Sequence, residues 1–204
     1  MLQNVSTMPP RRALEFGLYR DGDNNLDAIQ ESTVAQARRT SALDPSIEFT
    51  VEDTTELHPL NALRQTQGDT TLHTYQYTIA DGTVGDVRVG QPHDMSDEQN
   101  LARFVAQTLD NAERGGANQT WIDLVDHGGG DGGGLETGDG SVMSMPDIAK
   151  AIAEGTAMHA AAHPEDAARR VDGVVANQCL MDTMGFADAL SGAGVRYLAA
   201  SPAR

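Results

Sequence analysis

Short apolar runs alternate along this chain with longer stretches in which apolar residues recur every three or four positions. The short runs predict buried strands, and the longer stretches predict amphipathic helices that cover them. Strands are expected at residues 13–20, 47–52, 72–79, 121–126, 174–179 and 195–200, and helices at 26–41, 57–65, 97–113, 147–162 and 183–190. Strands that alternate with helices are typical of an α/β fold. We therefore expect a three-layer sandwich with a largely parallel central sheet of about six strands flanked by helices.

Polar residues at the predicted helix starts support these boundaries. Ser96, with Gln99 three residues later, matches a capping box. Ser144 followed by Pro146 matches the cap and first turn of another helix. The polar turn at residues 21–25 is expected to cap the first helix with its side chains.

Two short β excursions interrupt the alternation. Asp81-Gly82 predicts a turn into a hairpin arm at residues 83–89, and we expect this excursion to lie off the main sheet. Residues 135–142 predict a second, smaller hairpin. A length of 204 residues suits a single domain, so we expect one domain at residues 13–204, either complete or the N-terminal part of a longer precursor, preceded by a flexible extension at residues 1–12.

Composition narrows the classes of partner. Hydrophobic residues make up 39% of the chain, as in a globular protein, but no apolar run is long enough to cross a membrane. The net charge of −16, from 30 acidic and 14 basic residues, disfavours nucleic acid and anionic membranes as partners. It suits a solvated surface, a cationic substrate or a divalent metal. No secretory signal is visible in residues 1–12, and the only cysteine cannot form an internal disulfide.

Two of the predicted strands end on reactive side chains. His127 follows the strand at 121–126 and precedes six glycines in seven positions, and Cys179, the only cysteine, ends the strand after residues 174–176. Carboxyl ends of neighbouring parallel strands meet at one edge of a sheet, where ligands bind. The order, His before Cys, and the separation of 52 residues (179 − 127) resemble those in caspases. The alternatives are a flexible loop with an isolated histidine and a cysteine that is merely packed in the core.

A histidine beside a cysteine supplies the chemistry of a thiol nucleophile. The imidazole of His127 takes the thiol proton and later delivers it to the leaving group. Cys179 is expected to begin the turn into a helix, whose N-terminal N–H groups favour a negative charge. The backbone N–H groups of Gly128 and Cys179 are then the expected oxyanion donors.

The glycine run also allows a nucleotide-binding interpretation. Residues Gly128 to Gly133 match the spacing G-x-G-x-x-G after a strand. That motif requires a helix that opens directly on the last glycine and an acidic residue about 20 residues further on. A hairpin is predicted instead, so a nucleotide-binding domain remains a weaker alternative.

Two patterns resemble metal sites. Asp21, Asp23 and Asn25 alternate as in an EF-hand loop, but Leu26 and Ser32 stand where that loop needs Gly and Glu.

His159 and His163 lie four residues apart on one helix, as in zinc peptidases, but the glutamate of H-E-x-x-H is missing. The dipole at the helix C-terminus explains these histidines without a metal. The sequence therefore leaves metal binding unknown.

Three motifs carry a resemblance to a known family. Residues Tyr19–Asp27 (YRDGDNNLD), Asp126–Gly130 (DHGGG) and Gln178–Met181 (QCLM), in this order and spacing, resemble the clostripain-like cysteine peptidases of the caspase, legumain and gingipain group. The resemblance covers nearly the whole chain. It implies a caspase-like fold and a cysteine endopeptidase that uses His127 and Cys179, forms a thioester acyl-enzyme and cleaves after basic residues, preferably Arg. It also implies a secreted or cell-envelope enzyme, made as a zymogen and activated by proteolysis, whose chemistry requires no cofactor; Ca²⁺ affects some members.

Two departures from the family pattern matter. Asn177 stands where the family usually has an acid at the base of the pocket for Arg or Lys, and an amide gives up the charge-assisted part of that contact. Family members are also commonly much longer, so a second chain from the same precursor is a candidate partner besides the peptide substrate. Candidate sites of activation cleavage between the dyad members are Lys150, Arg169 and Arg170.

Two further hypotheses assign no catalysis to the chain. One is a catalytically silent caspase-like binding domain, in which Cys179 is only packed. The other is a calcium-controlled interaction protein, which Ca²⁺ would stabilise strongly without any proteolysis.

Overall fold

The computed structural model describes residues 12–56 and 71–202 of the 204-residue chain. One mixed sheet is built from β1 (Leu14–Gly22), β2 (Ile47–Thr55), β3 (His73–Ala80), β4 (Thr83–Val84), β5 (Arg88–Gly90), β6 (Gln119–Val125), β9 (Gly173–Asn177) and β10 (Tyr197–Ala200). Among the described residues the strand order is β10-β9-β6-β1-β2-β3-β4, with β5 also paired to β3. The five strands from β10 to β2 run parallel, and β3 runs antiparallel to β2. The predicted α/β sheet is confirmed.

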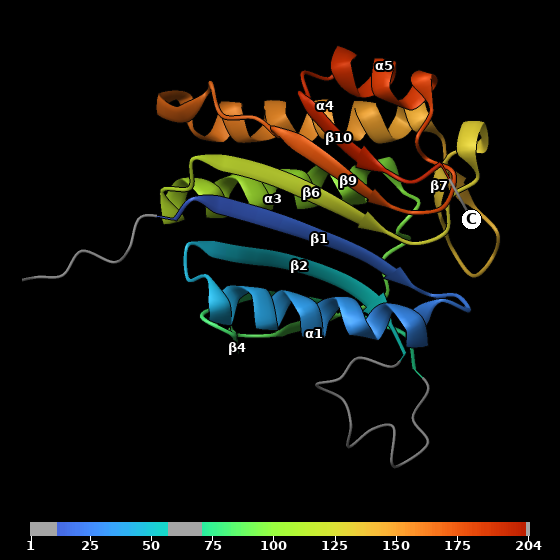
Figure 1. The fold of residues 1–204 in the computed structure, drawn as a ribbon, viewed down its shortest axis with the longest axis horizontal. Helices are drawn as coiled ribbons and strands as arrows, with labels where there is room; N and C mark the ends of the chain where they lie inside the picture. The colour runs from blue at the N-terminus through green and yellow to red at the C-terminus, as the bar shows by residue number, and fades with distance from the viewer. Residues whose placement is uncertain (1–11, 57–70, 203–204) are drawn as a thin grey trace, which may run out of the picture.

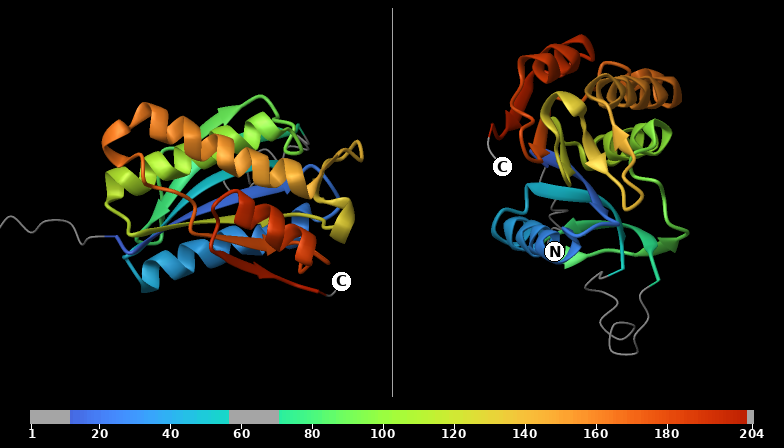
Figure 2. Two further views of the ribbon diagram at one scale, coloured as in Figure 1. Left: turned by 90° about the horizontal axis from the view of Figure 1, so that it is seen from above. Right: turned by 90° about the vertical axis from the view of Figure 1, so that its right-hand side faces the viewer.

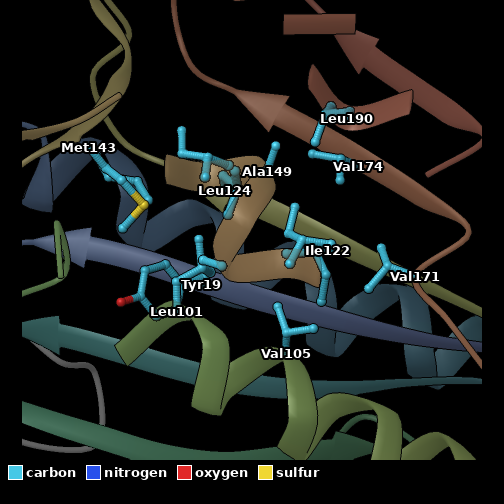
Figure 3. Packing of buried hydrophobic residues seen from close by; sticks show 14 of the residues in the cluster. Tyr19, Leu101, Val105, Ile122, Leu124, Met143, Ala149, Val171, Val174 and Leu190 are labelled. Atoms are coloured by element: carbon cyan, nitrogen blue, oxygen red, sulfur yellow. The ribbon is translucent and has the colours of Figure 1, made fainter. Parts of the chain in front are cut away.

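Helices cover both faces of the sheet and complete three layers (Figures 1 and 2). α3 (Glu98–Gly115), α4 (Met145–Ala162) and α5 (Met184–Gly192) pack on one face, and α1 (Asp27–Leu43) packs on the other. Successive side chains of β1 point to opposite faces of the sheet and so pack under different helices, because side chains alternate along a strand. Tyr19 belongs to the cluster under α3 and α4, which Figure 3 shows, and Leu18 belongs to the cluster under α1.

The cap of α3 differs from the sequence prediction. Asp97, not Ser96, precedes the helix, and its carboxylate accepts hydrogen bonds from the N–H groups of Gln99 and Asn100. The Ser96 hydroxyl instead donates to Asp94 at 2.7 Å. The predicted capping box is therefore wrong, because a carboxylate one residue later takes its place at the positive end of the helix.

The polar turn before α1 does not cap that helix as predicted. The helix begins after Leu26 without a side-chain cap. Asn24 accepts a hydrogen bond from the Leu26 N–H within the turn itself, and its amide nitrogen bonds to Asp126 beyond β6. The turn residues thus connect the ends of strands.

The first β excursion belongs to the main sheet, contrary to the prediction. β3 pairs antiparallel with β2. This position buries three of its side chains in the cluster under α1, those of Tyr75, Tyr77 and Ile79. The predicted arm at residues 83–89 is divided into β4 and β5, both of which pair with β3.

Other predicted elements are confirmed with small changes of boundary. Ser144 caps α4 with Pro146 in its first turn, and Thr183 caps α5. Residues 135–142 form the predicted hairpin, as β7 (Gly134–Glu136) and β8 (Val142–Met143). The predicted helix at 57–65 lies outside the described residues, as does the extension up to residue 11. No helix in the described part of the chain is long and apolar enough to cross a membrane.

Candidate active site

The sheet register brings His127 and Cys179 to the same edge. β6 and β9 are parallel neighbours, and Val125 pairs with Asn177 at the last position of their ladder. His127 and Cys179 each lie two residues beyond this pair, in the loops that follow two strands about 4.8 Å apart. The right-hand view of Figure 2 looks onto this carboxyl edge. β9 ends at Asn177, so Cys179 lies in the following turn rather than on the strand itself.

Gly128 places the two loops in direct contact. A Cβ atom at this position would overlap the carbonyl oxygen of Cys179 and would lie 2.9 Å from the Cys179 nitrogen. Only glycine therefore fits here without moving one of the loops. The backbone directly after His127 consequently packs against the backbone of Cys179.

Asn25 holds the imidazole of His127. The His127 Nε2 lies 2.7 Å from the Asn25 Oδ1. Because an amide oxygen can only accept, Nε2 carries the proton, and Nδ1 is the basic nitrogen of the neutral ring. Sequence reasoning assigned Asn25 to a helix cap and missed this contact. The sequence did contain a signal for it, because Asn25 follows β1. In the sheet, β1 lies beside β6, and β9 lies on the other side of β6.

The glycine-rich loop is ordered by its own hydrogen bonds. The Gly129 N–H donates to the Gly133 oxygen at 2.8 Å, and the Leu135 N–H donates to the His127 oxygen at 3.2 Å. Gly128 lies opposite Gly134, between these two bonds and in a non-hydrogen-bonded position. The N–H group of Gly128 therefore does not bond to the facing segment. A short 3₁₀ turn, η2 (Gly130–Gly132), follows where nucleotide binding would need an α-helix. The loop therefore lacks the helix that the nucleotide-binding alternative requires.

The surroundings of Cys179 correct one prediction. Cys179 is a free cysteine, and the residue is partly exposed. α5 begins only at Met184, so Cys179 does not begin the turn into this helix, and the helix dipole acts five residues away from it. Neither the Gly128 N–H nor the Cys179 N–H donates to another described residue. These are the two groups that the sequence predicts as oxyanion donors.

Two buried carboxyl groups lie beneath the histidine loop. Burial raises the pKa of Asp126 to about 7, and burial together with the charge of Asp126 raises the pKa of Asp21 to about 8. The Asn24 amide donates to Asp126 Oδ1 at 2.6 Å and to the Glu136 oxygen at 2.8 Å. Near neutral pH Asp21 is therefore largely protonated and Asp126 is about half protonated, which limits the negative charge beneath the histidine loop.

Asn177 lies over a groove that contains a carboxyl group. This exposed residue and Asp123 both line a cavity of about 270 Å³ between α1 and the sheet. Burial raises the pKa of Asp123 to about 7, and its Oδ1 has no hydrogen-bond partner among the described residues. Sequence reasoning missed Asp123. The sequence did contain a signal for it. Asp123 lies on β6 two residues before Val125, which pairs with Asn177, so its side chain points to the same face of the sheet as that of Asn177.

The basic residues between His127 and Cys179 differ in accessibility to a protease. Lys150 lies within α4 and pairs with Glu98 at 2.7 Å, so cleavage there would require unfolding of the helix. Arg169 donates to the Ala117 oxygen at 2.9 Å, whereas Arg170 is exposed in the connection before β9. Among the three predicted cleavage positions, Arg170 is the most accessible.

Comparisons with known proteins identify similar structures but no close relative in sequence. No family model matches the chain, and no curated protein matches it significantly. A zymogen C11 protease of Parabacteroides distasonis, described as inactive, is 15% identical, with a TM-score of 0.56 over 96% of this chain and 50% of that one. A secreted C11 cysteine protease of Bacteroides thetaiotaomicron in complex with an irreversible peptide inhibitor is 16% identical, with a TM-score of 0.59 over 93% of this chain and 49% of that one. A further structure of a secreted C11 cysteine protease from Bacteroides thetaiotaomicron, "iotapain", is 11% identical, with a TM-score of 0.62 over 96% of this chain and 54% of that one.

The extent of these matches decides what they establish. The chain spans about half the length of each of the three solved structures. At such low identity the similarity establishes the fold, which agrees with the resemblance carried by the three sequence motifs. The chain therefore has the fold of the C11, or clostripain-like, cysteine proteases.

Proposed function

We propose that this protein is a cysteine endopeptidase in which Cys179 is the nucleophile and His127 is the general acid and base. The observation that carries the proposal is the contact between Gly128 and the backbone of Cys179. It joins the loop of the histidine to the loop of the only thiol at the carboxyl edge of two adjacent parallel strands. The shared fold with C11 cysteine proteases supports the same assignment.

The first half of the reaction forms a thioester. His127 Nδ1 accepts the Cys179 proton while the contact with Asn25 keeps the other proton on Nε2. The thiolate attacks the peptide carbonyl carbon, and the N–H groups of Gly128 and Cys179 stabilise the oxyanion. His127 then delivers its proton to the departing amine, and the carbon–nitrogen bond breaks.

Water completes the reaction. His127 removes a proton from the water as it attacks the thioester, and the same two N–H groups bind the second oxyanion. The tetrahedral intermediate expels the Cys179 thiolate and releases the carboxylic acid product. Cys179 recovers its proton from His127, so the net change is hydrolysis of one peptide bond.

The proposed substrate is a peptide with a basic residue before the scissile bond, lying extended along an open edge near the site. Asn177 can hydrogen-bond a guanidinium, and Asp123 in the same groove supplies a carboxyl group that becomes charged above about pH 7. In one of the similar structures a secreted protease holds a peptide inhibitor, which supports a peptide as the substrate class.

Zymogen processing, secretion and a second chain remain proposals of the same kind. We infer from the family resemblance that the enzyme is secreted and activated by proteolysis, with exposed Arg170 as the favoured internal cleavage position. Intact mass of the incubated protein, with and without Ca²⁺, tests this. A fragment that ends at Arg170 and is missing in Cys179→Ala supports self-processing, and an unchanged mass in both conditions contradicts it.

Labelling with an arginyl chloromethyl ketone tests the proposed dyad directly. Because Cys179 is the only cysteine, one adduct per chain identifies the modified atom without ambiguity. The reaction should run about 10²- to 10⁴-fold faster than that of free cysteine, and His127→Ala should lose this advantage while it retains the thiol. Reaction no faster than that of free cysteine would instead favour the silent binding domain.

A further inference from the structure

A second group of histidines lies at the opposite edge of the sheet from Cys179. His159 and His163 stand near the C-terminal end of α4, and Asp110 and Glu113 stand on α3 beside them. Asp166 lies in the short turn η3 (Pro164–Asp166) that follows α4. We call these five residues the histidine cluster.

Asp110 contacts both imidazoles. Its Oδ1 lies 2.6 Å from His159 Nδ1 and 3.3 Å from His163 Nε2. The two rings stack with their centroids 4.8 Å apart. In a tetrahedral zinc site, ligand atoms at bond lengths of about 2.0–2.1 Å lie about 3.3 Å from one another. The three ligand atoms all lie within 4.8 Å of one another, and the Asp110 carboxylate is 39% exposed, so it has room to move and admit an ion between the three groups.

Each imidazole also has a second carboxylate behind it. His163 Nδ1 lies 2.7 Å from Glu113 Oε2, and His159 Nε2 lies 3.7 Å from Asp166 Oδ2. Histidines that bind metals usually direct their other ring nitrogen at a carboxylate, which fixes the ring and its tautomer. His163 has this arrangement. The Asp166 carboxylate, which also binds Arg169, lies near the other nitrogen of His159 without a hydrogen bond to it.

The proton positions without a metal leave one buried atom unsatisfied. The contact with Asp110 places a proton on His159 Nδ1, and His159 Nε2 is then buried with no hydrogen-bond partner among the described residues. The dipole at the end of α4, which explains these histidines from sequence, does not satisfy this atom. If a metal replaces the proton on Nδ1, the proton moves to Nε2, where the carboxylate of Asp166 can accept it.

We propose that the histidine cluster binds one divalent ion of the zinc type. The ligands are His159 Nδ1, His163 Nε2 and the Asp110 carboxylate, with water in the fourth position, while Glu113 and Asp166 orient the two imidazoles. Two nitrogen ligands favour zinc over Ca²⁺ and Mg²⁺, which prefer oxygen. The ion joins α3 to α4 at the edge away from the proposed dyad, so its role is to stabilise the fold.

Titration of the whole chain with Zn²⁺ tests this site. Cys179→Ala serves as the parent, because the thiol and His127 could themselves bind zinc. Calorimetry should give one ion per chain, bound at least tenfold more tightly than Ca²⁺, and the melting temperature should rise with zinc concentration. His163→Gln and Asp110→Asn should each weaken zinc binding by about tenfold or more. Both side chains are partly exposed, so these variants are suitable even if a change at the buried His159 prevents folding.

His93→Gln is the matched control. His93 Nδ1 also contacts a carboxylate, Glu52, at 3.0 Å, but it belongs to none of the candidate metal groups in the described residues. Zinc affinity should stay within about twofold of the parent in this variant. Unchanged zinc affinity in both His163→Gln and Asp110→Asn, with circular dichroism showing that they are folded, overturns the proposal. An equal loss of affinity in His93→Gln also overturns it.

Discussion

The two edges of the sheet use histidine in opposite ways. At the carboxyl edge, His127 is partly exposed, lies on a loop beside the thiol loop and is held by the uncharged amide of Asn25. At the amino edge, the His159 side chain is completely buried between helices and is held by the carboxylate of Asp110. An accessible imidazole with one free basic nitrogen can transfer protons. A buried imidazole between carboxylates is a fixed ligand or a structural contact.

Replacement of the proposed nucleophile gives the strongest contrast between the edges. Cys179→Ala should abolish cleavage of arginyl amide substrates, a loss of about 10⁴-fold or more in kcat, because no other described side chain at this edge offers a thiol. The melting temperature should stay close to that of the parent, since the thiol is only partly buried. Retained turnover in this variant would remove Cys179 from the reaction.

Exchange of one histidine at each edge tests the comparison itself. His127→Ala should lower kcat/KM by about 10²- to 10⁴-fold, which is the usual contribution of a general base. His163→Gln should leave kcat/KM within about twofold, because its cluster lies at the other edge of the sheet. Steady-state kinetics at saturating Zn²⁺ and in chelator measure both variants. A comparable loss of activity in the two variants would contradict the separation of roles.

Asn25 is proposed as a positioning residue for His127. Asn25→Ala should lower kcat by about 10- to 100-fold with little change in KM, because the imidazole loses the contact that fixes its tautomer. Asn25→Asp keeps an acceptor and should recover part of kcat. Its negative charge should also move the acidic limb of the pH–rate profile to higher pH. An unchanged profile in both variants would assign Asn25 a structural role only.

Charge in the groove below Asn177 should tune substrate preference. Asn177→Asp should raise the ratio of kcat/KM for Arg over Ala substrates by about tenfold, since a carboxylate makes a charge-assisted contact. Asp123→Asn should lower the same ratio, and this loss should grow above pH 7, where Asp123 becomes charged. If neither variant changes the ratio, the basic side chain binds elsewhere.

The smallest expected effect concerns stability rather than activity. Folding raises the pKa of Asp21 from 3.8 to about 8. Between these pH values the folded state therefore binds more protons than the unfolded state. The free energy of unfolding consequently falls as the pH rises from about 4 to 8. Asp21→Asn should remove part of this decline and raise the melting temperature at pH 8 by about 2–4 °C relative to the parent, with little change near pH 4.

Asp139→Asn is the control for this pH dependence. Hydrogen bonds with Ser141 hold the pKa of this exposed carboxyl group below its ordinary value. The slope of melting temperature against pH between 5 and 8 should therefore stay as in the parent. An Asp21→Asn slope equal to that of Asp139→Asn would contradict the assignment to Asp21.

Local sequence patterns predict those features that are determined by one strand and the residues directly after it. Buried runs before His127 and Cys179 predict parallel strands, and parallel strands place their ends at one edge. The sequence could not show that Asn25 reaches His127, because that contact joins residues 102 positions apart through the order of the strands. The same holds for β3, whose place beside β2 is decided by the burial of Tyr77 and its neighbours.

The cap of α3 shows a different reason for failure. Ser96 and Asp97 are both good capping residues, and a difference of one position depends on backbone geometry that composition does not specify. The histidines at residues 159 and 163 show a third reason. Helical spacing places them on one face, but the carboxylates opposite them come from α3 and η3.

The missing side chain at Gly128 gives this fold a simple means of losing chemistry. Even alanine at this position would act as a wedge between the two loops, because its methyl group would occupy the space of the Cys179 carbonyl. The proposed chemistry thus depends on the absence of a side chain at position 128 as well as on His127 and Cys179.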